Sequence, residues 1–197
     1  SAKDLDDAIS VSRTRSGGYK LGVHIADVSH YIKEGTALDE EAISRGTSVY
    51  FADRVVPMLP EALSNGVCSL NAGEDKLTFS AIIHLDGEGN MEKYEFRKSI
   101  IRSKVRGVYS EVNEIFDKTA SKELREKYAP VIRGLNAARE LANLLKERAK
   151  ERGNMDLESV EPYFTLDENG VCIDVQPRVS GEAEQMIEQL MVCANQA

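Results

Sequence analysis

Three aspartates lie within four residues near the start of the chain, at Asp4, Asp6 and Asp7, and an apolar run follows them. On a strand, Asp4 and Asp6 point to one face and Asp7 to the other, and a bend or bulge after Asp6 could bring all three together. Three carboxylates held close together repel one another, and a cation would relieve that repulsion. Hard divalent ions such as Mg²⁺ prefer oxygen ligands of this kind. The spacing therefore indicates a candidate metal site, with a solvated acidic loop as the alternative.

The overall charge of the chain gives no general reason to expect binding to nucleic acid. The net charge is −8, from 33 acidic and 25 basic residues, and such a surface repels phosphate. The cysteines Cys68, Cys172 and Cys193 are widely spaced, which argues against a disulfide framework or a zinc site and fits a reducing compartment. The sequence shows no signal peptide and no apolar run long enough to span a membrane. We therefore expect a cytoplasmic protein with no membrane partner.

The elements that must position the aspartates are predicted from periodicity and turn signals. Apolar residues alternate in segments that are bounded by glycine, which is typical of β-hairpins. The predicted hairpins pair residues 7–14 with 19–28, residues 76–86 with 91–103, and the two halves of 162–177.

Other parts of the chain show helical periodicity. Residues 36–46 have an acid-rich start and a glycine at the end, which indicates a short helix. An apolar stripe that includes Leu135 and Leu141 predicts one long helix around residues 121–152, and a second stripe predicts a helix over 180–197. The predicted fold class is α+β, a mixed and mainly antiparallel sheet with hairpins packed against several helices.

Longer motifs carry a family resemblance. In chain order they are "AKDLDDAI", "GVHIADVSHYI", "SVYFADRVVPMLPEALSNGVCSLN" and "MIEQLMVCAN". Together they resemble the ribonuclease II/ribonuclease R family of processive 3′→5′ exoribonucleases, and the ribonuclease R branch is the nearer match. The resemblance extends from Ala2 to Gln196, and its most specific stretch is Pro57–Leu70.

The resemblance implies that residues 1–197 are the N-terminal part of an RNB-type catalytic domain. The first predicted strand begins almost at residue 1 and the last predicted helix reaches Ala197 without a capping residue, so we expect this domain to be truncated at both ends. Cold-shock-like domains would precede it in the parent chain, and an S1 domain would follow it. Residues 1–197 alone are expected to be inactive, because later parts of the active site would be missing.

Members of this family hold four aspartates in the pattern D-x-x-x-x-x-D-x-D-D, and Asp4, Asp6 and Asp7 match the last three. The resemblance implies hydrolysis of RNA from its single-stranded 3′ end to nucleoside 5′-monophosphates, with Mg²⁺ or Mn²⁺ as the cofactor. Asp7 would be a metal ligand, and Asp4 and Asp6 would orient the attacking water or hold a second ion. Metal ions in such sites stabilise charge on the attacking and leaving oxygens of the phosphoryl group.

Two further residues match substrate-binding positions of the family. Tyr50 would pack against the base at the RNA 3′ end, whereas the alternative is a core tyrosine beside Phe51. Glu188 would contact the terminal nucleotides, whereas the alternative is a solvated charge at the edge of a helix. The family often has a second glutamate where Gln189 stands and an aromatic residue near Leu157, so the sequence departs from the family pattern at both places.

Structural roles are favoured for other polar residues. His24 lies inside an apolar strand, and Asp27 is suited to capping a helix or forming a turn. The basic run from Arg97 to Arg106 is either a solvated strand face or a phosphate contact. The alternatives to an exoribonuclease are an inactive RNA-binding or regulatory relative with the same fold, and an acidic protein-interaction domain.

Overall fold

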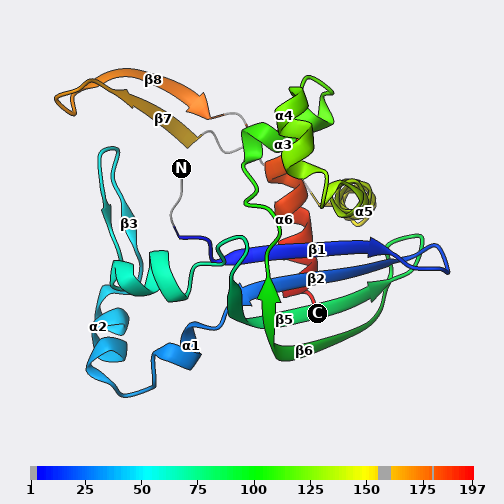
Figure 1. The fold of residues 1–197 in the computed structure, drawn as a ribbon, viewed down its shortest axis with the longest axis horizontal. Helices are drawn as coiled ribbons and strands as arrows, with labels where there is room; N and C mark the ends of the chain where they lie inside the picture. The colour runs from blue at the N-terminus through cyan, green and yellow to red at the C-terminus, as the bar shows by residue number, and fades with distance from the viewer. Residues whose placement is uncertain (1–3, 155–160, 179) are drawn as a thin grey trace.

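The computed structural model describes residues 4–154, 161–178 and 180–197. Within these residues the main sheet has four antiparallel strands in the order β1-β2-β5-β6 (Figure 1). Its strands are β1 (Asp7–Arg13), β2 (Tyr19–Ala26), β5 (Asp75–Leu85) and β6 (Met91–Arg102). Both predicted hairpins of this sheet are confirmed, and β2 pairs with β5 to join them.

Tight turns set the register of both hairpins. Gly17 has a φ of 89° in the β1–β2 turn, a left-handed conformation that glycine adopts without steric cost. In the β5–β6 turn, the Asp86 carboxylate accepts hydrogen bonds of 2.9 Å from the backbone N–H groups of Glu88 and Asn90. These local bonds fix which side chains of each strand face the helices.

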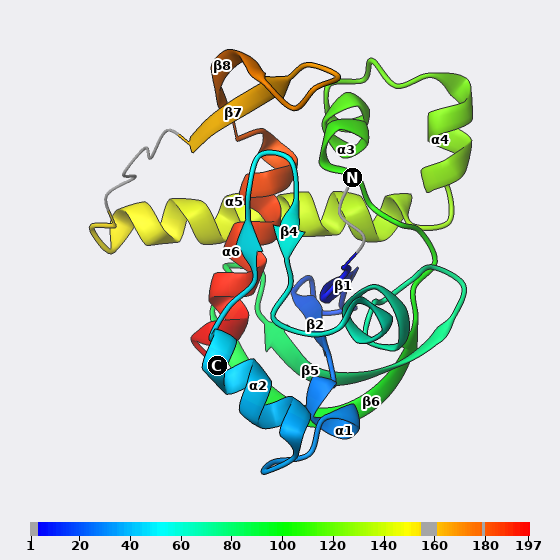
Figure 2. The same ribbon diagram turned by 90° about the vertical axis from the view of Figure 1, so that its left-hand side faces the viewer.

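One face of the main sheet is covered by α5 (Ile132–Glu151) and α6 (Glu182–Asn195) (Figures 1 and 2). The two helices pack against each other, with α5 on β1 and α6 on β2. Large apolar side chains of both layers have no solvent exposure: Leu21, Ile83, Leu141 and Leu190. Each such side chain stabilises the fold by roughly 1.5–3 kcal/mol on burial. The predicted α+β class is confirmed.

The single helix predicted around residues 121–152 is two separate helices. α4 (Lys122–Tyr128) ends before Pro130, and α5 begins at Ile132. Proline has no backbone N–H to donate to the preceding turn, so one continuous helix cannot run through this position. The preceding helix, α3 (Tyr109–Phe116), packs against α6 and α4. Over the described residues, no helix combines the length and the apolar content needed to cross a membrane.

A group of small elements lies between β2 and β5 in the chain. They are α1 (Val28–Tyr31), α2 (Ala37–Arg45), β3 (Val49–Tyr50), β4 (Val55–Val56) and the π-helical turn η1 (Ala62–Val67). The short helix predicted over 36–46 is confirmed as α2, and the hydroxyl of Thr36 caps its first turn. The β3–β4 hairpin was not predicted, because its strands are too short to show an alternating pattern.

Another hairpin, β7 (Glu161–Leu166) and β8 (Cys172–Arg178), confirms the one predicted over residues 162–177. The Asp167 carboxylate closes its turn by accepting hydrogen bonds from the N–H groups of Asn169 and Val171. In both ribbon views this hairpin stands away from the main sheet, and the tip of the β3–β4 hairpin reaches toward it (Figures 1 and 2).

Candidate active site

The segment that carries the three aspartates is held in an extended form by hydrogen bonds to two distant parts of the chain. The N–H of Leu5 donates to the Ser69 hydroxyl at 3.1 Å, and the N–H of Leu70 donates to the Leu5 carbonyl at 2.8 Å. On the other side, the N–H of Ala26 donates to the Asp6 carbonyl at 2.9 Å. The backbone of the acidic segment is therefore fixed between the end of β2 and the loop after η1.

A small apolar cluster lies under this segment. It consists of Ala26, Cys68 and Leu70, which are 3–6% exposed, and Ala8 at the start of β1 packs against it. Two of its members come from the long motif Pro57–Leu70, so that motif positions the aspartates by packing and backbone hydrogen bonds. The sequence identified the motif as specific to the family, and the structure gives it this supporting role.

The carboxylates of the segment influence one another. Burial raises the pKa of Asp6, and the negative charges of Asp4 and Asp7 raise it further. Burial also raises the pKa of Asp7, opposed by a hydrogen bond from its own backbone N–H. Burial raises the pKa of the Cys68 thiol, and the charge of Asp6 adds to this. The carboxyls of Asp6 and Asp7 thus lie where solvent stabilises their ionised forms less well than in an unfolded chain.

The described residues do not by themselves make up a complete metal site. Across residues 4–154, 161–178 and 180–197, no three or more His, Cys, Asp or Glu side chains gather into a group that could hold a metal ion. The chain continues from Asp6 directly into β1 at Asp7, and the charges of Asp4 and Asp7 both act on the Asp6 carboxyl. The donor chemistry fits a hard divalent ion, which would need further oxygen ligands from water, substrate or other protein groups.

Tyr50 joins this acidic segment from the β3–β4 hairpin. Its hydroxyl donates a 3.2 Å hydrogen bond to an Asp4 carboxylate oxygen, and the charge of Asp4, followed by this bond, raises the pKa of Tyr50. The ring is 65% exposed, and the neighbouring Phe51 ring is 52% exposed. The alternative of a core tyrosine is therefore wrong. The Arg54 guanidinium lies over the Phe51 ring, 5.5 Å from its centre.

Glu188 occupies a different part of the molecule. It is exposed on α6 and lines a cavity of about 360 Å³ between α6, the end of α5 and the β5–β6 turn. Gln189, Arg148 and Arg152 line the same cavity, whereas Tyr50 and the aspartates do not. Within the described part of the chain, no hydrogen bond or ion pair joins Glu188 to the aspartate segment. Leu157, the other departure from the family pattern, lies outside the described residues.

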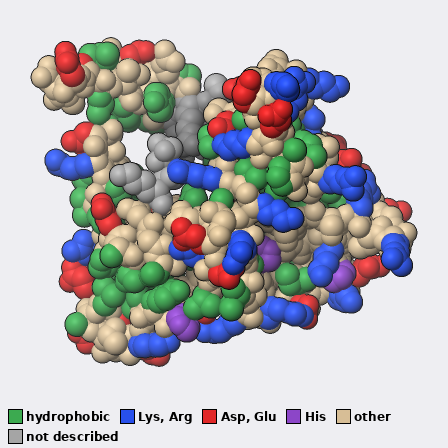
Figure 3. Space-filling model, viewed as in Figure 1, with side chains coloured by type: hydrophobic (Ala, Val, Ile, Leu, Met, Phe, Trp, Pro, Cys, Tyr) green, Lys and Arg blue, Asp and Glu red, His purple; other side chains and the backbone are tan. Residues whose placement is uncertain are grey.

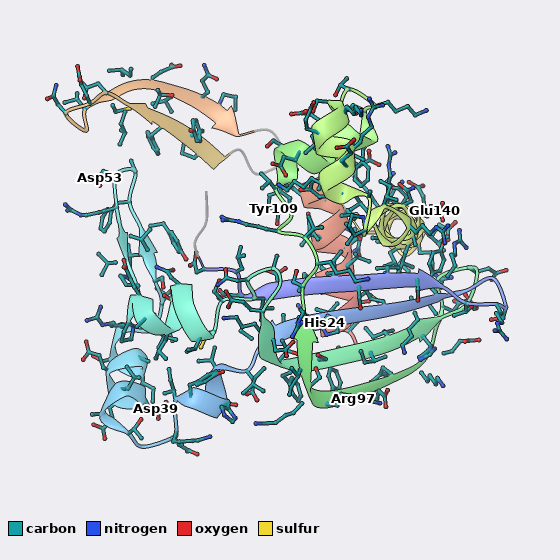
Figure 4. The ribbon with its side chains drawn as sticks, in the orientation of Figure 1. His24, Asp39, Asp53, Arg97, Tyr109 and Glu140 are labelled. Carbon is teal, nitrogen blue, oxygen red and sulfur yellow. The ribbon has the colours of Figure 1, made fainter. Side chains whose placement is uncertain are left out.

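His24 has a structural environment within the main sheet, as predicted (Figure 4). Its ring nitrogens make hydrogen bonds to the hydroxyls of Ser10, at 3.0 Å, and Ser80, at 2.7 Å. Burial lowers the pKa of His24, which favours the neutral ring. Asp27 precedes α1 but caps no backbone N–H; instead its carboxylate accepts a 2.8 Å bond from the Ser29 hydroxyl.

The basic run on β6 is largely engaged in ion pairs along the sheet. Lys98 pairs with the buried Asp27 at 3.1 Å, and Arg102 pairs with Asp75 at 2.7 Å. Arg97, on the outer side of the sheet in Figure 4, pairs with Glu95. These pairs support the prediction of a solvated strand face and leave the phosphate contact without support from the geometry.

Residues 1–197 match a single protein-family model over their whole length, that of the RNB domain. The chain belongs to the RNB domain family. The resemblance inferred from the motifs is therefore confirmed. The nearer match to the ribonuclease R branch is confirmed too, because the relatives that match this RNB chain include ribonuclease R proteins.

Individual relatives agree over nearly the entire RNB chain. Ribonuclease R of Thermotoga maritima is 50% identical over 196 residues, which are 99% of this chain and 27% of that protein. RNase R of Mycoplasma genitalium, in complex with ribose-methylated single-stranded RNA, has a TM-score of 0.92 at 37% identity, covering 99% of this chain and 30% of that one. Its complex with double-stranded RNA gives the same TM-score. The RNB chain thus spans about a quarter of the length of the curated relatives it matches.

The sequence reasoning did not identify the aromatic residues of β7. Tyr163 and Phe164 are 61% and 43% exposed, and they line a cleft with Tyr50 and Phe51. The adjacent pair of aromatic residues was the available signal. Neighbouring residues on a strand point to opposite faces, and a two-stranded hairpin has no second layer of its own in which to bury such rings.

Proposed function

We propose that this RNB chain is part of the catalytic domain of a 3′→5′ exoribonuclease that degrades RNA processively to nucleoside 5′-monophosphates with Mg²⁺ or Mn²⁺. The observation that carries the proposal is the 3.2 Å hydrogen bond between the Tyr50 hydroxyl and Asp4. It joins an exposed aromatic ring to the acidic segment, in a chain that matches the RNB domain from end to end. A group that can stack a base therefore lies beside groups that can hold the metal for cleavage.

The acidic segment would supply the metal ligands. Asp7 would bind the cation, and Asp4 and Asp6 would orient the attacking water or hold a second ion. A divalent cation supplies stabilisation of the charge that develops on the attacking and leaving oxygens of the phosphodiester. The raised pKa values of Asp6 and Asp7 arise from burial and mutual repulsion, and bound positive charge offsets both.

Tyr50 would position the end of the strand. Every nucleobase has a flat π-face, so stacking on the exposed ring is tolerant of sequence and contributes roughly 1–3 kcal/mol per base. The bond to Asp4 orients the ring, so the stacked nucleotide would lie with its phosphodiester near the carboxylates. Glu188 would contact the terminal nucleotides from α6. Cold-shock-like and S1 domains of a longer cytoplasmic protein would bind the rest of the RNA.

The direct test is metal-dependent release of nucleotides by the full-length enzyme. A 5′-labelled single-stranded RNA is incubated with the enzyme in EDTA, and Mg²⁺ or Mn²⁺ is then added. We expect nucleoside 5′-monophosphates only after the metal is added. The labelled full-length RNA should then be converted to a short 5′ end product with few intermediates, as processive digestion from the 3′ end requires. Residues 1–197 on their own, assayed in parallel, are expected to release none.

The alternatives give different results in the same experiment. RNA binding without hydrolysis at any metal concentration would identify an inactive RNA-binding relative. An absence of both binding and hydrolysis would exclude RNA as the substrate. Shorter fragments that keep the original 3′ end of the RNA would show internal cleavage and would contradict exonucleolytic digestion from the 3′ end.

A further inference from the structure

One hydrogen bond that fixes the acidic segment depends on the identity of a side chain. The N–H of Ala26 donates to the Asp6 carbonyl, and the N–H of Leu70 donates to the Leu5 carbonyl. These two bonds join backbone groups, so most residue types could supply them. A further bond runs from the N–H of Leu5 to the Ser69 hydroxyl at 3.1 Å. Position 69 must therefore carry a hydrogen-bond acceptor on its side chain.

Ser69 and Leu70 together fix both peptide groups that link Asp4 to Asp6. The Leu5 N–H belongs to the peptide group that follows Asp4, and the Leu5 carbonyl belongs to the peptide group that precedes Asp6. Because a peptide group is planar, turning it changes the direction of the side chains on either side. The two bonds therefore set the directions in which the carboxylates of Asp4 and Asp6 point.

Ser69 lies behind the acidic segment, in the interior of the protein. It has no solvent exposure, and its hydroxyl also donates a 3.4 Å bond to the Asn71 side-chain oxygen, which leaves a lone pair for the Leu5 N–H. The acidic segment contacts Tyr50, which lines the cleft that Figure 3 shows as a hollow between the β7–β8 hairpin and the main body. A substrate in that hollow can approach the carboxylates, whereas the buried Ser69 acts only through the groups that it contacts.

A second buried serine differs from Ser69 in what its hydroxyl contacts. Ser80 also has no solvent exposure, but its hydroxyl bonds to side chains of the main sheet, His24 at 2.7 Å and Thr78 at 3.1 Å. These bonds hold side chains of the sheet and do not involve the backbone between Asp4 and Asp6. Ser80 is therefore a matched control for the loss of a buried hydroxyl.

We propose that Ser69 is a positioning residue for the hydrolysis of RNA, because its hydroxyl holds the Leu5 N–H and so keeps Asp4 and Asp6 in their working arrangement. This inference rests on the proposed function and adds to it a residue that touches neither RNA nor metal. Loss of the hydroxyl would leave the Leu5 N–H without its acceptor, and the segment would gain freedom to turn. Small misplacements of catalytic groups lower the rate of the chemical step strongly.

The test compares variants of the full-length enzyme at position 69. Amide hydrogen exchange, followed by mass spectrometry without metal or RNA, reads the Leu5 N–H directly, and we expect it to be about 10-fold faster in Ser69→Ala. The kcat for single-stranded RNA with Mg²⁺ should fall about 10- to 100-fold, with KM changed less than about threefold, because Ser69 cannot contact the strand. Ser69→Thr keeps the hydroxyl and should restore slow exchange and most of kcat. Ser69→Cys has a weaker acceptor, so it should give intermediate values, and it replaces Ser69→Ala if that variant does not fold.

Ser80→Ala controls for a general loss of stability. We expect its melting temperature to fall about as much as that of Ser69→Ala, while the Leu5 exchange and kcat match those of the parent. An unchanged kcat in Ser69→Ala, an equal fall in Ser80→Ala, or unchanged exchange at Leu5 would each overturn the inference. If the parent released no monophosphates, the proposed function would fail and the catalytic role of Ser69 with it, whereas the exchange result would still show whether Ser69 holds the segment.

Discussion

Leu141 of α5 and Tyr50 of β3 are both large side chains with apolar surface, yet Leu141 has no solvent exposure and Tyr50 is 65% exposed. The difference extends to their surroundings. Leu141 belongs to the helix-covered sheet, formed by β1, β2, β5 and β6 with α5 and α6, where side chains of two layers interlock. Tyr50 lines the cleft between the β3–β4 and β7–β8 hairpins, together with Phe51, Tyr163 and Phe164.

The comparison shows that the side chains that stabilise the fold are different from those that remain available to bind a partner. The helix-covered sheet buries its apolar side chains against each other, and this burial is the main favourable term in folding. The aromatic rings that line the cleft between the two hairpins stay exposed to solvent, so burying their apolar surface against a partner would contribute to the free energy of binding. The aspartate segment lies between the two regions, since its backbone is bonded to β2 and to the loop after η1, while Asp4 contacts Tyr50. The helix-covered sheet thus supports a segment of carboxylates and exposed rings that remain available for binding.

The substitution Asp6→Asn should have the largest effect on activity and little effect on stability. In the full-length enzyme we expect turnover to fall about 1000-fold, corresponding to several kcal/mol of lost transition-state stabilisation. RNA affinity should stay within a factor of about two, because Asn keeps the size of the side chain. Single-turnover kinetics and equilibrium binding measure the two quantities. Wild-type turnover would exclude Asp6 from catalysis.

Leu141→Ala should, in contrast, mainly reduce the stability of the fold. Removing this fully buried side chain leaves a cavity in the helix-covered sheet, and we expect the free energy of unfolding to fall by about 2–5 kcal/mol. Ile43→Ala on α2 is the control, because Ile43 is 72% exposed and its loss should cost less than about 0.5 kcal/mol. Denaturation in urea measures both. Equal losses for the two variants would show that the buried layer does not determine stability.

Tyr50→Ala should change the end products of digestion and leave the melting temperature unchanged. Loss of stacking removes roughly 1–3 kcal/mol of base binding, so short fragments should dissociate earlier and the final products should be longer. Tyr50→Phe keeps the ring but loses the bond to Asp4 that orients it, so its products should be intermediate in length between those of the parent and those of Tyr50→Ala. Gel separation of limit digests gives the lengths. A large fall in melting temperature would instead mean that the ring supports the fold.

The smallest effect concerns the pH dependence of stability. The pKa of Asp6 is raised in the folded state from its usual value of 3.8, so the folded state binds this proton more tightly than the unfolded state does. Its contribution is therefore fully present below about pH 4 and is lost as the pH rises through the raised pKa. Asp27, whose pKa is lowered chiefly by the hydrogen bond from Ser29, acts in the opposite direction and loses its contribution on acidification.

Comparing Asp6→Asn with the parent isolates the first contribution. The difference in unfolding free energy should favour the variant near neutral pH and should shrink toward pH 4, as followed by denaturation at several pH values. A variant that is less stable than the parent at neutral pH would contradict the raised pKa. The comparison uses the same two proteins as the turnover measurement, so stability and catalysis are read from one substitution.

The sequence alone predicted the elements whose patterns are local. Alternation and glycine turns predicted both hairpins of the main sheet and the β7–β8 hairpin, and the apolar stripe around Leu141 predicted the helix that covers the sheet. These predictions succeed because side-chain period and turn chemistry depend on neighbouring residues. The motifs were also long enough to indicate the family. The same local reasoning missed the interruption at Pro130, where the stripe was given more weight than a residue that cannot continue a helix.

Only the tertiary structure decided which of the marked residues lie together. It placed the Tyr50 hydroxyl on Asp4, set Glu188 in a separate cavity, paired Lys98 with Asp27, and brought β7 opposite the β3–β4 hairpin. It also showed that the charges of Asp4 and Asp7 both act on Asp6, although no group of three or more His, Cys, Asp or Glu side chains in the described residues could hold a metal ion by itself. Each of these outcomes depends on how separate segments pack and on what remains exposed afterwards. Such contacts join residues that are far apart in the chain, and no local pattern encodes them.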